Sequence, residues 1–200
     1  GRRDLLLMEN PPSREAMKEH GEKWNELIPP SRIVAGRAGG VIVNRASELE
    51  SLTLGQVRAI FSGEVDNWAY VGGTGLKAPN GEGRRVPIRR YGLPAGCPAT
   101  DVFYREGVPR NKIRSTRRVA DTKKAVAKVS MNARAIAFVD LTRMPEGADS
   151  VKVLPIEIEV GEEWRRVAPT PENVRNAMYP LSSRLRLYVH PQAGEAARDL

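Results

Sequence analysis

The sequence is poor in the residues on which covalent and metal chemistry most often depend. It contains one cysteine and two histidines in 200 residues. A single cysteine excludes an internal disulfide, and with two distant histidines it makes no recognisable zinc-binding spacing. Paired acids and a nucleophile with a neighbouring base are also missing from the pattern. We therefore expect no cofactor, no metal site and no enzymatic activity.

Long apolar runs are also absent. No stretch approaches the roughly 20 apolar residues that a membrane-spanning helix needs. The apolar run at 5–8 is too short for the core of a signal peptide and is followed by Glu-Asn-Pro-Pro. If the protein is exported, we expect its signal to lie outside this chain. The hydrophobic fraction of 40% and the charged fraction of 28% indicate a folded globular domain.

Positive charge is concentrated in one part of the chain. The formal net charge is +8, yet residues 84–128 hold thirteen Lys and Arg against three acids, a local net charge of +10. The rest of the chain holds 19 basic and 21 acidic residues, a net charge of −2. Such a field attracts anions, although a solubilising basic face explains the same composition.

Short apolar segments alternate with helical patterns along the chain. Thr53 has the features of a helix N-cap, and Thr170 followed by Pro171 marks another helix start. The alternation predicts an α/β fold with a mixed or largely parallel sheet flanked by helices. The strands are predicted at residues 5–8, 33–44, 86–91, 135–139, 151–160 and 185–189. The helices are predicted at 13–27, 53–61, 99–106, 121–129, 171–177 and from 192 onward, with a Gly-rich loop at 72–83.

Four stretches carry a resemblance to a known family. Residues 51–68 read SLTLGQVRAIFSGEVDNW, residues 135–139 read AIAFV, and VIVN at 41–44 precedes both. The fourth stretch begins with PTPENV at 169–174 and continues through YPL and LRLYV. In order and spacing these segments resemble the phosphate-binding, substrate-binding proteins of ABC transporters. Phe61, Trp68, Phe138 and Tyr179 are expected to be core and turn residues rather than ligands.

The resemblance implies a periplasmic-binding-protein-like fold of type II, in which a ligand lies between two lobes. It assigns residues 1–40 to a remnant of the first lobe and the hinge strand. Residues 41–180 would form the second lobe, a mostly parallel mixed sheet with helices. Residues 181–200 would form the return strand and the start of a truncated helix. We therefore expect a second lobe that is nearly complete, with fragments of the first.

The family's anion site supplies the candidate ligands. Arg90 matches the anion-binding arginine after a strand, and Arg89 precedes it. Cys97-Pro98-Ala99 falls where the family has Ser-Gly-Thr, and Thr100 takes the threonine position if the helix shifts by one residue. Glu9 falls where an acid would read the proton on monohydrogen phosphate. The expected ligand set is Arg90, Cys97, Ala99, Thr100, Arg89 and Glu9.

This loop departs from the family pattern in ways that weaken a cradle of N–H donors. Pro98 has no N–H, the Cys97 thiol is a weak donor, and Ala99 lacks a hydroxyl. A hydrogen bond to a charged group contributes ~1.5–3 kcal/mol, so two or three losses weaken binding by roughly a hundredfold or more. Cys97 itself is open to two explanations, a reactive thiol beside arginines or a small residue that caps a helix.

Three functions stay open at this point. The first is a module that binds phosphate or a similar oxyanion, either for an ABC transporter or as an anion sensor. The second is a scaffold that keeps the fold but has lost ligand binding and contacts a protein partner. Nucleic-acid binding is the third and is not favoured, because no recognised motif accompanies the basic segment. The phosphate-binding function implies a periplasmic or extracellular location. Its possible partners are the permease of an ABC transporter, or a separate segment that completes the first lobe.

Overall fold

The computed structural model describes residues 5–8, 32–71, 86–107 and 116–189. The chain divides into two compact units, one formed by residues 1–37 with 183–200 and the other by residues 38–182. In the first unit, β1 (Leu5–Met8) pairs antiparallel with β10 (Ser182–Val189). Both strands agree with the predictions for these segments. The helices predicted at 13–27 and from 192 onward, and the Gly-rich loop at 72–83, lie outside the described residues.

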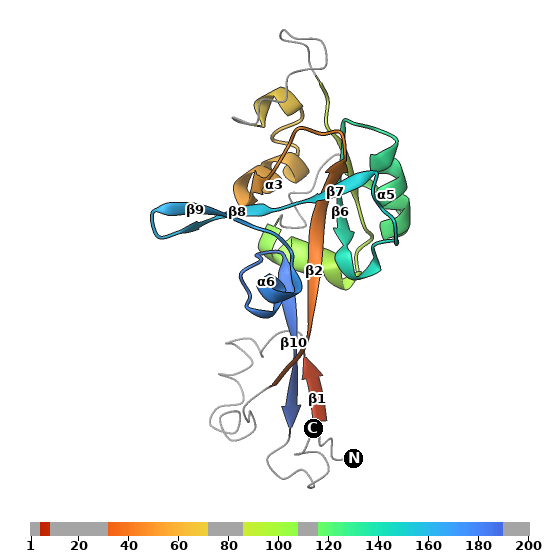
Figure 1. The fold of residues 1–200 in the computed structure, drawn as a ribbon. Coiled ribbons are helices and arrows are strands. Elements are labelled where there is room, and N and C mark those ends of the chain that lie inside the picture. Colours follow the sequence, from red (N-terminus) through yellow and green to blue (C-terminus); the bar gives the residue numbers. More distant parts are fainter. Residues whose placement is uncertain (1–4, 9–31, 72–85, 108–115, 190–200) are drawn as a thin grey trace. The chain divides into compact units, whose positions relative to one another are not determined.

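The second unit is built on a mixed sheet (Figure 1). In strand order it contains β2 (Arg32–Asn44), β6 (Ala135–Asp140), β4 (Arg89–Gly92) and β5 (Arg117–Arg118). The pairs β6–β4 and β4–β5 are parallel, whereas β2 pairs antiparallel with β6 and with β7 (Val151–Leu154). The mixed α/β class predicted from the sequence is thereby confirmed.

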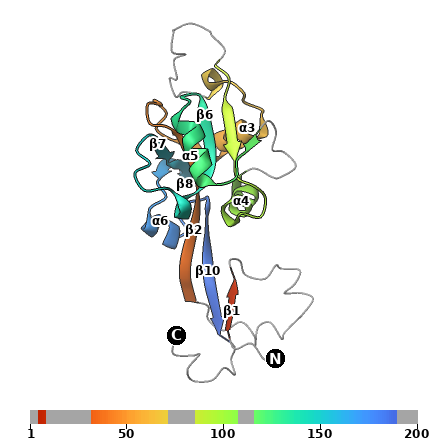
Figure 2. The same ribbon diagram turned by 90° about the vertical axis from the view of Figure 1, so that its right-hand side faces the viewer.

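Helices cover both faces of this sheet. The helix α5 (Thr122–Ser130) packs on one face, and Figure 2 shows it in front of β6. On the other face lie α3 (Leu54–Ser62), α4 (Pro98–Val102) and the π-helical turn Phe103–Gly107. All six side chains of β6 are buried, because alternate residues face the two layers of helices.

Two apolar clusters fill the layers on either side of the sheet. The cluster on the α3 side takes Ile136 and Phe138 from β6, and the cluster on the α5 side takes the alternate residues of that strand. The four aromatic side chains that the sequence assigned to the core are all buried, namely Phe61, Trp68, Phe138 and Tyr179. No helix among the residues that the structure describes is long and apolar enough to cross a membrane.

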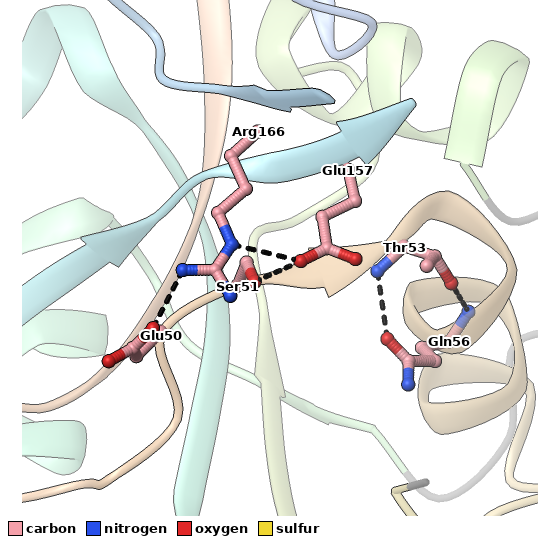
Figure 3. A network of polar contacts seen from close by, with 6 residues as sticks. All are labelled: Glu50, Ser51, Thr53, Gln56, Glu157 and Arg166. Carbon is pink, nitrogen blue, oxygen red and sulfur yellow. Dashed lines mark hydrogen bonds and ion pairs between the residues drawn. The ribbon is translucent and has the colours of Figure 1, made fainter. Parts of the chain in front are cut away.

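Local signals in the sequence explain where α3 begins and ends. The Thr53 hydroxyl accepts a hydrogen bond from the Gln56 amide at 3.1 Å, and the Gln56 side chain accepts one from the Thr53 amide at 2.8 Å (Figure 3). This reciprocal capping box satisfies two amides that a helix start leaves unpaired. Gly63 closes the helix in the left-handed region, with φ of 83°. The predicted N-cap at Thr53 is confirmed.

The prediction of one long strand at 151–160 is wrong, because this segment forms two strands that belong to two different sheets. Pro155, which has no N–H for a strand ladder, separates β7 from β8 (Ile156–Val160). The second strand leaves the main sheet and lies between β3 (Leu52–Thr53) and β9 (Glu163–Val167). Its pairing with β3 is parallel and its pairing with β9 is antiparallel.

A polar network fastens the β8–β9 hairpin to the segment before α3 (Figure 3). The Ser51 hydroxyl donates to Glu157 Oε1 at 2.5 Å, and Arg166 Nε donates to the same oxygen at 3.1 Å. Arg166 Nη1 also reaches Glu50 Oε2 at 2.6 Å. These hydrogen bonds raise the pKa of Arg166 from its ordinary value. Arg166 and Glu50 are exposed, so we assign their ion pair a role in orienting the hairpin rather than in overall stability.

Candidate functional site

The candidate site lies where β4 ends in the second unit. The chain leaves the strand at Gly92, turns through residues 93–96 and enters α4 with Cys97 as the N-cap. The neighbouring strands β6 and β5 run parallel to β4, so their carboxyl ends lie at the same edge of the sheet. In open α/β sheets ligands bind beyond this edge. A cavity of about 210 Å³ lies here, and its wall includes Gly92, Thr100 and Arg118.

Thr100 is the most unusual residue of this cavity. Thr100 is only 2% exposed, and its Oγ1 has no hydrogen-bond partner within the part of the chain that the structure describes. Its amide, in contrast, donates to the Cys97 carbonyl at 2.8 Å. A buried hydroxyl without a partner destabilises the fold by ~1–3 kcal/mol.

Arg118 brings positive charge to the same cavity, although the sequence did not single it out. It is the second residue of β5, where it pairs with Gly92 of β4, and its side chain is exposed. The only feature of the sequence that pointed to Arg118 was its position in the basic segment 84–128. A two-residue strand is too short to leave a periodic pattern, so its position next to β4 could not be inferred.

Arg90, the main predicted ligand, lies in a different environment. It is 5% exposed, and its Nη1 donates to the Val65 carbonyl at 3.1 Å. Its Nε has no hydrogen-bond partner among the described residues. Burial lowers the pKa of Arg90 from its ordinary value, and the charge of Asp66 opposes that shift. Arg90 thus supports the turn after α3.

Arg89 and Arg90 line a second cavity, of about 440 Å³, together with Arg117. Thr100 does not line this cavity, and neither Arg89 nor Arg90 lines the first one. Thr116 is shared by both walls. The structure therefore places the predicted arginines beside the Thr100 cavity rather than within it.

The remaining predicted ligands have local structural positions. Cys97 caps α4 without a side-chain hydrogen bond, and its carbonyl accepts from the amides of Thr100 and Asp101 at 2.8 and 3.2 Å. Pro98 occupies the first helical position, and Ala99 packs in the core on the α3 side. Glu9 lies outside the described residues. Within 5–8, 32–71, 86–107 and 116–189, no group of three His, Cys, Asp or Glu side chains could hold a metal ion.

Comparison with known proteins supports the fold assignment. A family model described as the PBP superfamily domain matches residues 14–200. An ABC-type phosphate transport receptor from Vibrio cholerae aligns with a TM-score of 0.67 and 17% identity, over 98% of this chain and 70% of that one. PstS from Borrelia burgdorferi aligns with a TM-score of 0.73 and 13% identity, over the same shares of the two chains.

A third similar structure is a high-affinity periplasmic phosphate-binding protein with bound phosphate. It aligns with a TM-score of 0.57 and 13% identity, over 94% of this chain and 65% of its own length. At identities of 17% or less, these likenesses show a common fold and leave the ligand of this chain to be argued from its own residues.

Proposed function

This chain belongs to the PBP superfamily, and on that premise we propose that it binds phosphate or another small oxyanion. It would act as the substrate-binding component of an ABC transporter or as an anion sensor. The similar structures support this proposal, because one is described as an ABC-type phosphate transport receptor and another as a phosphate-binding protein with bound phosphate. No comparison favours the alternative of a scaffold without a ligand.

One observation carries the proposal in this chain. Thr100 and Arg118 both line the cavity at the end of β4, and the buried Thr100 hydroxyl has no hydrogen-bond partner among the residues that the structure describes. A hydroxyl donates one hydrogen bond to an anion, and a guanidinium offers a planar fork of donors that matches two oxygens of the same anion. The local net charge of +10 over residues 84–128 raises the concentration of anions near this edge.

The six predicted ligands take different roles in this proposal. Thr100 contacts the anion, while Arg89 and Arg90 contribute positive potential from the neighbouring cavity. Cys97 and Ala99 shape the turn that holds Thr100 in place. Glu9 stays a prediction for the group that reads the proton of a protonated oxyanion.

No chemical step is needed for this function, and we propose that the protein is not an enzyme. Binding desolvates the anion and replaces its water with fixed donors, and release to a permease would reverse the exchange. A periplasmic or extracellular location follows from this proposal, since substrate-binding components capture solutes outside the cytoplasmic membrane.

Calorimetric titration with inorganic phosphate at moderate salt tests the proposal, with sulfate as the comparison anion. Arg118→Met is the test variant. Arg117→Met is its matched control, because it removes the same charge from the adjacent position of β5 but faces the second cavity. A hydrogen bond to a charged group is worth ~1.5–3 kcal/mol, so Arg118→Met should weaken binding at least about tenfold. The absence of saturable heat at millimolar concentrations of both anions would overturn the proposal.

A further inference from the structure

The strand β9 is the outer strand of the three-stranded sheet. Among the residues that the structure describes, its only strand neighbour is β8, and Figure 1 shows the two strands as a hairpin that extends away from β6 and β7. Its first four residues are exposed, including Trp164 at 60%. An outer strand with an unpaired edge is a template on which a strand of another chain can pair.

The turn of this hairpin indicates which backbone groups point to the open edge. Gly161 and Glu162 form a two-residue turn, with Gly161 in the left-handed region at φ of 68°. The residues that flank such a turn exchange hydrogen bonds across the ladder, whereas those of the next pair do not. Trp164 and Glu159 are that next pair. We therefore expect the N–H and C=O of Trp164, and those of Arg166, to point away from β8.

The order of charges along β9 suits a second copy of the same strand. Antiparallel pairing about a two-fold axis places one residue opposite its own copy, and this central residue sets the register. With Trp164 at the centre, Glu163 lies opposite the partner's Arg165, and symmetry repeats the pair. Glu162 then lies opposite the partner's Arg166 in the same way. Centring on Glu163, Arg165 or Arg166 instead places like charges opposite each other, which destabilises a sheet.

Charged side chains on an outer strand usually prevent pairing, but here both signs occur in an order that permits one register. Arg165 lies 3.3 Å from Glu163 of its own strand, and both side chains are more than half exposed. They are therefore accessible to a second strand. The exposed ring of Trp164 would gain from burial against its copy, as aromatic pairs across a sheet do.

We propose that the open edge of β9 pairs antiparallel with β9 of a second copy and joins the two hairpins into one sheet. Trp164 lies at the centre of this interface, and Glu163 and Arg165 set the register. A strand of five residues buries less than the roughly 800 Å² per partner of a standard interface, so we expect a dimer in the micromolar range. No residue of β9 lines either cavity beside β4, so this interface is independent of the proposed anion site.

Sedimentation velocity of the full chain over a series of concentrations measures this dimer. Arg165→Glu and Glu163→Arg each place like charges opposite each other, and each should weaken association at least about tenfold. An equimolar mixture of the two variants restores opposite charges at both positions, and it should associate about as tightly as the wild type. Circular dichroism melts of each variant establish that it is folded.

The central tryptophan has a test of its own. Trp164→Thr keeps a residue that favours strands but removes the ring, so it should weaken association at least about tenfold. Tyr70→Thr is the matched control, because Tyr70 is 72% exposed but lies outside β9, and it should leave association unchanged. A dimer that Trp164→Thr does not weaken would overturn this interface.

The remaining outcomes decide the pairing and its register. A wild-type chain that sediments as a monomer up to millimolar concentration overturns the dimer. Dimers that persist in both charge variants, or variants whose mixture stays monomeric, overturn the register centred on Trp164.

Discussion

Replacing Thr100 by valine should make the unliganded protein more stable, which is unusual for a change at a fully buried position. The substitution exchanges a hydroxyl for a methyl group of similar shape and keeps the branched side chain within α4. The hydroxyl is buried with no hydrogen-bond partner in the described segments of the chain, and this destabilises the folded state by ~1–3 kcal/mol. Allowing for imperfect packing of the methyl, we expect the free energy of unfolding to rise by about 1–2 kcal/mol.

The assay is urea and thermal unfolding in a buffer free of phosphate, sulfate and phosphonates. For a chain of this length, the expected gain corresponds to a rise in Tm of roughly 2–8 °C. Thr122→Val is the matched control, since Thr122 is equally buried at 2% but its hydroxyl bonds the backbone of Asp140 in both directions. The control should lose about 1–3 kcal/mol. If Thr100→Val lost as much as Thr122→Val, the hydroxyl would have a partner within the protein, and the reasoning would be refuted.

Two further changes test the core. Burial raises the pKa of Tyr179, so the stability that this group contributes is fully present below pH 10 and is lost as the pH rises through the folded-state value. Tyr179→Phe should therefore reduce the fall of the urea midpoint between about pH 10 and 11, and an unchanged fall would contradict this. The same change should raise the free energy of unfolding at pH 7 by about 1 kcal/mol, because the hydroxyl has no hydrogen-bond partner among the described residues. Gly39→Ala should lower the free energy of unfolding by about 1–3 kcal/mol, because a Cβ there would overlap the Phe138 ring, and a urea midpoint equal to that of wild type would contradict this packing.

Parts of the fold whose signals are local could be predicted from the sequence. The start of α3 at Thr53 depends on side chains three residues apart, and the buried strand β6 is a continuous apolar run. The division of residues 151–160 into two strands was harder to predict from the sequence. Pro155 marks the break, but which sheet each half joins depends on pairing with β2 and with β3, which lie more than a hundred residues away.

The ligand set expected from the sequence stays a prediction, and the structure bears only on where its residues lie. Thr100, in the loop that resembles a known anion loop, is one of the residues that line the cavity at the end of β4. Arg90 was expected beside it. Arg90 instead bonds the Val65 carbonyl in the turn after α3, a contact between residues 25 positions apart that no local pattern reveals. Arg118 lines the cavity because β5 pairs in parallel with β4, and a two-residue strand leaves no pattern from which that pairing could be predicted.

A titration of isotope-labelled protein with inorganic phosphate, followed by amide chemical shifts, tests most directly whether this edge of the sheet binds an oxyanion. We expect saturable shifts that are largest at Gly92, Thr100 and Arg118, and smaller at Arg89 and Arg117, which lie at the neighbouring cavity. Saturable shifts centred on another part of the chain, or none at millimolar phosphate, would contradict an oxyanion site at the Thr100 cavity.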